Sequence, residues 1–123
     1  MNRLFIIGNA CSDPVVRTTP SGKNVTNFNV AVNRRKKKDD GSQEADFFRI
    51  SAWDQLGDVC AKYITKGKKV CVIGSVGVHV YTNNKGEAAA NLEVLASEVE
   101  FCSPSDIDQK SGYQKVQPND LPY

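Results

Sequence analysis

Apolar and polar residues alternate along most of residues 1–102, and this period of two predicts a protein built mainly of β-strands. Turn-forming residues separate the alternating segments, as at Asp13-Pro14 and Pro20-Ser21-Gly22. Two polar stretches that contain glycine, residues 34–41 and 83–86, predict hairpin turns. The predicted strands run over residues 2–8, 25–33, 46–53, 70–81 and 91–101.

The segment between the third and fourth predicted strands has the spacing of an amphipathic helix instead, over residues 54–64. Asp54 stands at its expected beginning, where a carboxylate caps or favours the N-terminus. Gly67, between two lysines, marks its expected end. The apolar residues of this helix are Leu56, Val59, Cys60 and Tyr63.

Three strands, one helix and two strands within about 100 residues favour a five-stranded oligonucleotide/oligosaccharide-binding (OB) barrel, although another small β-barrel stays open. Gly74 and Gly77 stand where a long strand would bend to close such a barrel. The apolar parity of the last strand switches between Ala96 and Val99, which predicts a bulge. The expected core residues include Phe28, Val30, Val32, Ile50 and Val72.

The composition changes at Ser103, where a segment poor in apolar residues begins. Such a segment buries too little surface to order itself, so we expect a disordered tail over residues 103–123 behind one folded domain, residues 1–102.

The third predicted strand has two unlike faces, because successive side chains of a strand point to opposite sides. One face is apolar and is expected to join the core: Phe48, Ile50 and Ala52. The other face carries two rings and a guanidinium: Phe47, Arg49, Ser51 and Trp53. Rings spaced along a cationic strand suit the stacking of unpaired bases. A strand buried on both faces, with Arg49 in a salt bridge, is the competing interpretation.

The net charge of the chain is only +2, so the distribution of charge is more informative than the total. Five consecutive cations occupy residues 34–38 and are followed directly by Asp39 and Asp40. This run is typical of a solvated loop, but a flexible arm that neutralises phosphates has the same composition.

No catalytic or metal-binding pattern is present in the sequence, which argues against an enzyme. The cysteines show no Cys-x-x-Cys spacing, and the single histidine, His79, has no cluster of ligands near it in sequence. Neither a targeting segment nor an apolar run of membrane-spanning length is found, so we expect a cytoplasmic protein with reduced cysteines. The cysteines are Cys11, Cys60, Cys71 and Cys102.

A series of short motifs resembles the bacterial single-stranded DNA-binding proteins, in a short form, over residues 1–102. In chain order the motifs are Met1-Asn2-Arg3, Gly8-Asn9, Asp13-Pro14, Arg17, Pro20-Ser21-Gly22, Ala31-Val32-Asn33-Arg34-Arg35, Ala45-Asp46-Phe47, Ala52-Trp53, Tyr63, Lys66-Gly67 and Glu93-Val94. The resemblance implies an OB barrel without a cofactor that assembles as a homotetramer. It also implies sequence-independent binding of single-stranded DNA in replication, recombination and repair, at the nucleoid.

The resemblance also implies roles for individual residues. Its stacking positions fall on Phe47, Trp53 and Tyr81. Its phosphate-binding cations fall on Arg3, Arg17, Arg34, Arg35 and Arg49, with Lys36, Lys37 and Lys38 as helpers. A C-terminal tip that recruits replication and repair proteins would comprise Asp120, Leu121, Pro122 and Tyr123.

Three departures from the family pattern change this expectation. Lys36 stands where another stacking aromatic is usual, so binding should depend more on phosphate contacts and on salt. Gly77 and His79 lie on a strand that is often more basic in relatives. The tip has a single acid, Asp120, and the short tail favours a phage or mobile-element copy.

Two other functions stay open on the sequence alone. The same barrel can serve as an adaptor in a replication or restart complex, with DNA contact secondary. The barrel could instead bind RNA. No residue in the sequence can be identified as a contact to the 2′-hydroxyl, so the sequence does not distinguish RNA from DNA as the ligand.

Overall fold

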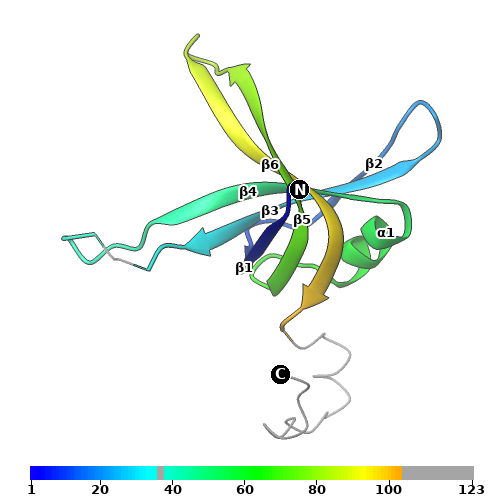
Figure 1. Ribbon diagram of the computed structural model, residues 1–123, viewed down its shortest axis with the longest axis horizontal. Helices are drawn as coiled ribbons and strands as arrows, with labels where there is room; N and C mark the ends of the chain where they lie inside the picture. The colour runs from blue at the N-terminus through cyan, green and yellow to red at the C-terminus, as the bar shows by residue number, and fades with distance from the viewer. Residues whose placement is uncertain (36–37, 104–123) are drawn as a thin grey trace, which may run out of the picture.

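The computed structural model describes residues 1–35 and 38–103. Its secondary structure consists of six strands and one helix (Figure 1). In chain order these are β1 (Leu4–Ala10), β2 (Val15–Thr18), β3 (Asn24–Asn33), β4 (Ala45–Trp53), α1 (Asp54–Tyr63), β5 (Lys69–Thr82) and β6 (Ala88–Phe101).

Five of the strands close into a barrel, as the sequence predicts. The hydrogen-bonded order β1-β5-β6-β4-β3 is completed by a short pairing of β1 with β3 through Asn9↔Ala31 and Ala10↔Val30. The pairs are antiparallel except β4 with β6, which run parallel. The helix α1 lies between β4 and β5 in the chain, which completes the OB arrangement.

One strand, β2, is absent from the sequence prediction. It pairs only with β3 and lies outside the ring of five. All of its residues are exposed, so it lacks the alternation of buried and exposed positions that identifies the other strands.

The core fills the barrel and extends to one face of α1. Phe28, Val30, Ile50 and Val72 are buried as predicted, whereas Val32 is only half-buried at the edge of the core. Cys60 of α1 is fully buried, and this burial raises the pKa of its thiol to about 11. Cys60 is therefore a protonated packing residue at neutral pH.

Helix α1 begins at Asp54, as the sequence predicts, but Asp54 is not its cap. Trp53 occupies the N-cap position in an extended conformation, and no side chain caps the helix. Asp54 lies in the first turn and has a φ of +54°, a left-handed value that aspartate tolerates better than most residues. This sharp change of direction places the Trp53 ring at the corner between strand and helix.

The predicted bulge lies in β6. Ile73 pairs with Glu98 and Gly74 pairs with Ala96, so Ser97 is an extra residue on that strand. A Cβ atom at Gly74 would lie 2.1 Å from the backbone oxygen of Leu95. Only glycine fits this close approach, so Gly74 allows β5 to pack closely against β6 at the bulge.

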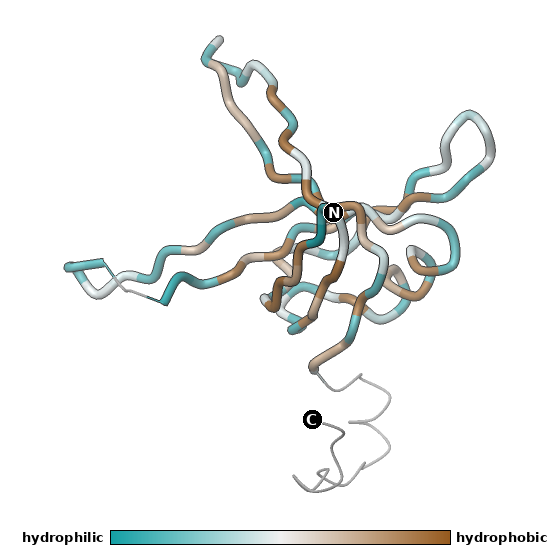
Figure 2. The backbone as a smooth tube through the Cα atoms, in the orientation of Figure 1, coloured by the Kyte–Doolittle hydropathy of each residue, from teal (hydrophilic) through white to brown (hydrophobic). Residues whose placement is uncertain are grey.

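Three hairpins, β2–β3, β3–β4 and β5–β6, project from the barrel in different directions (Figure 1). The tip of the β3–β4 hairpin is strongly hydrophilic, whereas β5 carries apolar residues well into its hairpin (Figure 2). Val78 and Val80 share the parity of the core residues Val70 and Val72 but are 66% and 68% exposed, because β5 has left the barrel at that point.

Candidate nucleic-acid interface

The two faces of β4 are divided as the sequence predicts. Ile50 and Ala52 are completely buried, whereas Phe47 is 63% exposed and Trp53 is 38% exposed. Arg49 lies between these rings on the outer face and is also exposed. The interpretation of β4 as a strand buried on both faces is therefore wrong.

The outer face of β4 continues across its neighbours. Arg49 lies opposite Asn29 of β3 and opposite Glu93 of β6, so all three side chains share one side of the sheet. The Arg49 Nε atom is 3.9 Å from a carboxylate oxygen of Glu93, a distance too long for a hydrogen bond. Because both side chains are exposed, this ion pair restrains Arg49 only weakly.

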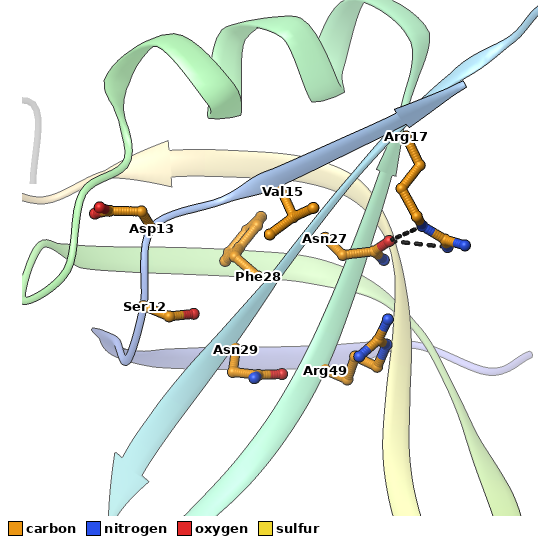
Figure 3. Close-up of a pocket in the computed structure, with 8 residues that line it drawn as sticks. All are labelled: Ser12, Asp13, Val15, Arg17, Asn27, Phe28, Asn29 and Arg49. Carbon is orange, nitrogen blue, oxygen red and sulfur yellow. Dashed lines mark hydrogen bonds between the residues drawn. The ribbon is translucent and has the colours of Figure 1, made fainter. Parts of the chain in front are cut away.

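A second arginine, Arg17 of β2, is held over the same face by a neutral side chain. Its Nε and Nη2 atoms donate to the Oδ1 atom of Asn27, at 3.1 and 3.0 Å (Figure 3). Asn27 is buried, and its amide nitrogen donates to the Ser51 hydroxyl at 2.8 Å and to the Ile50 carbonyl at 3.2 Å. Among the described residues Arg17 forms no ion pair, so its guanidinium is positioned while no carboxylate compensates its charge.

Three hollows follow the outer face of β4 from one ring to the other. A hollow of about 370 Å³ lies beside Phe47, and one of about 180 Å³ lies between Arg17 and Arg49. These two share Asn29 and Arg49 in their walls, so they are adjacent. A third, of about 530 Å³, is lined by Trp53 and by residues of the turn between β2 and β3.

The cations of the β3–β4 hairpin have a different environment. Arg34 forms ion pairs with Glu44 and Asp46, each at 2.9 Å, and Lys38 pairs with Glu44 at 3.1 Å. The hydrogen bonds that Arg34 donates to Asp46, together with the negative charge of Asp46, raise the pKa of Arg34 above its ordinary value. The basic arm thus contains carboxylates that neutralise Arg34 and Lys38, which the sequence interpretation of a phosphate-binding arm does not anticipate.

The remaining predicted site residues are more scattered. Tyr81 is exposed on β5, near the tip of the β5–β6 hairpin, and Arg35 is exposed at the end of β3. Arg3 is exposed and directly precedes β1. Lys36, Lys37, the tail and its tip at residues 120–123 lie outside the described residues.

Sequence reasoning missed the polar residues of β3 that line the site, Asn27 and Asn29. Both alternate with the core residues Phe28 and Val30, so the parity that identifies the core also identifies them as outward-facing. Their role becomes visible only with β2, because Arg17 reaches Asn27 across the β2–β3 pairing.

No helix in the described part of the chain is long and apolar enough to cross a membrane. Within the same residues, no group of three or more side chains of the metal-binding types is arranged to hold an ion.

The closed barrel with a helix between β4 and β5 defines an OB fold, and comparison with known proteins identifies the family within that class. The single-strand binding protein family matches residues 1–102. A "Single-stranded DNA-binding protein" of Halalkalibacterium halodurans is 35% identical over 112 residues, which cover 91% of this chain and 67% of the relative. "Single-stranded DNA-binding protein 1" of Staphylococcus aureus strain MSSA476 is 35% identical over 117 residues, covering 94% and 75%. The chain belongs to the single-strand binding protein family, whose members are DNA-binding proteins and not enzymes.

Proposed function

We propose that this protein binds single-stranded DNA along the outer face of β3 and β4, with bases stacked on Phe47 and Trp53. The observation that carries the proposal is the exposure of both rings on one face of a strand, with Arg49 between them. Aromatic rings recognise every base through its flat face, so this arrangement binds unpaired bases without reading their sequence.

The distance between the rings suits several nucleotides. Phe47 and Trp53 are six residues apart, which corresponds to about 20 Å along a strand. The hollows along the face provide space for bases over that length, and Arg17 lies beside the central one. Arg17 and Arg49 supply positive charge for the phosphates that pass between the two stacking points.

Assembly into a homo-oligomer, proposed here as a homotetramer, is supported by the outer face of β1. Phe5 and Ile7 are 64% and 55% exposed on this face, and the described part of β1 pairs with β3 only through Asn9 and Ala10. Most of one β1 edge therefore keeps unpaired backbone groups, which favours pairing with another strand. A second copy of the chain would cover both the edge and the exposed apolar side chains.

We also propose a cellular role and a location for the protein. Protection of single strands during replication, recombination and repair follows from binding without sequence preference, and the tip at residues 120–123 is the proposed point of contact for partner proteins. All four cysteines are free, which supports a reducing compartment, the cytoplasm, with the protein at the nucleoid.

Replacement of Trp53 by alanine tests the proposed function. We expect the affinity of Trp53→Ala for an oligothymidylate to fall by about 5- to 150-fold, the equivalent of about 1–3 kcal/mol for one stacked base. Fluorescence polarisation of a labelled strand at moderate salt measures this change. Tyr63→Ala is a matched control, because Tyr63 is also 38% exposed but lies on α1, away from β4. Equal affinities of the wild type and Trp53→Ala would contradict stacking on Trp53.

A further inference from the structure

The long hairpin of β5 and β6 carries a second pair of rings that the proposed site does not yet include. His79 and Tyr81 are two residues apart on β5, so both project from the same face, and both are exposed. Their rings lie within 13° of parallel, with centroids 6.1 Å apart. Residues two apart in a strand are separated by about 6.6 Å, so the backbone itself keeps the rings at this spacing.

The spacing is close to what one base requires. Stacked bases are about 3.4 Å apart, so a base with a ring on each side needs about 6.8 Å between those two rings. The distance of 6.1 Å between the ring centroids is near this value, and rotation of the two exposed side chains can widen the gap between the rings.

The surroundings leave the space between the rings accessible. Gly77 precedes His79 on the same face, and a Cβ atom added to it would meet nothing within 4 Å. Across the hairpin, His79 pairs with Asn91 and Tyr81 pairs with Ala89, neither of which has a large side chain. No bulky residue on the paired strand therefore covers the two rings.

The pair is also connected to the face of β4. Asn91, the partner of His79, lines the hollow that contains Phe47 and Arg49. Glu93, which lies opposite Gly77, is paired with Arg49. A strand that stacks on Phe47 can therefore continue over β6 and reach the two rings of β5.

We propose that His79 and Tyr81 hold one unpaired base between their rings, in what is here named the His79–Tyr81 slot. This inference rests on the proposed binding of single-stranded DNA, and it adds His79 to the residues that contact a base. In the slot, one base gains two stacking contacts where Phe47 and Trp53 each provide one.

Proton NMR of the wild-type protein tests the slot directly, because His79 is the only histidine of the chain and its imidazole signals need no further assignment. The protein is saturated at low salt with an oligothymidylate or with an abasic strand of the same length. We expect the oligothymidylate to shift the imidazole carbon-bound protons upfield, since a stacked base shields them, and the abasic strand to leave them nearly unmoved. Equal shifts with both strands, or none with the bound oligothymidylate, would overturn the slot.

Variants provide the second measurement. His79→Ala should weaken oligothymidylate binding by about fivefold or more, and His79→Phe should restore it, because a flat ring is what the slot requires. Val78→Ala is the matched control, since Val78 is the exposed neighbour on the opposite face and should leave affinity unchanged. Unaltered affinity of His79→Ala would refute the slot alone. A wild-type protein that bound no oligothymidylate would instead refute the proposed function.

Discussion

Two arginines, Arg17 on β2 and Arg34 at the β3–β4 hairpin, show how the partner of a side chain changes its electrostatic environment. Arg17 is held by the amide oxygen of Asn27, a neutral group, whereas Arg34 is held by two carboxylates, Glu44 and Asp46. Both guanidinium groups are positioned, but only Arg17 keeps an uncompensated charge. A count of cations along the sequence treats the two arginines as equal sources of positive charge, whereas in the structure carboxylates compensate the charge of Arg34.

In the proposed mode of binding, this difference determines where the phosphates of DNA are held. A phosphate that approaches Arg17 meets a preorganised donor at no electrostatic cost, whereas a phosphate that approaches Arg34 must displace a carboxylate. The centre of the face is therefore the principal phosphate site in our account, and the hairpin tip contributes less than its sequence suggests.

Of the changes that test this comparison between arginines, removal of Arg17 should have the largest effect. Arg17→Ala is expected to lower the affinity for single-stranded DNA by about tenfold, because a hydrogen bond to a charged group is lost. The slope of log affinity against log salt should also decrease by about 0.7, the value for one phosphate contact on a single strand. Titrations at four salt concentrations measure both quantities. An unchanged slope would show that Arg17 does not contact phosphate.

A second variant gives Arg17 a carboxylate partner, like those that Arg34 has in the β3–β4 hairpin, and so tests the comparison between the two arginines. Asn27→Asp keeps the oxygen that accepts from Arg17 but adds a negative charge, so the affinity should fall by several-fold with Arg17 still in place. The lost donor to the Ile50 carbonyl should lower thermal stability modestly, which a melting curve at the binding temperature monitors. If the folded variant binds as tightly as the wild type, the charge of Arg17 is not what matters.

The reverse change, in the tip, should have the smallest effect and the opposite sign. In Glu44→Gln/Asp46→Asn, Arg34 keeps neutral acceptors but loses its ion pairs, so we expect affinity to rise about two- to threefold at low salt and the salt slope to steepen. Addition of Arg34→Ala to this variant should remove the gain, while Arg34→Ala alone should change affinity by twofold or less, on the order expected for an exposed ion pair. A large loss in Arg34→Ala alone would contradict the comparison.

Much of the fold can be predicted from the sequence, because each strand of the barrel buries one face and exposes the other. Alternation identifies the inward residues Phe28, Val30, Ile50 and Val72, and the switch of parity in β6 identifies the bulge. The same rule fails at Val78 and Val80, where β5 continues past the barrel and nothing covers its apolar side. It also fails for β2, a strand with no buried residue.

The candidate site is predictable only in part. Strand parity places Phe47, Arg49 and Trp53 together on one exposed face. The partners of the cations are not predictable in this way, because they depend on contacts between residues distant in sequence. Arg17 and Asn27 meet through an unrecognised strand, and Arg34 meets Asp46 across a hairpin whose register is set in three dimensions.

The central claim is that unpaired bases stack on the outer face of β4, and Trp53 reports on it directly because it is the only tryptophan of the chain. Titration of the wild-type protein with an oligothymidylate, monitored through the intrinsic tryptophan fluorescence, follows that single ring. Our account predicts strong quenching that saturates together with binding measured by polarisation. Complete binding without a change in the emission of Trp53 would contradict it.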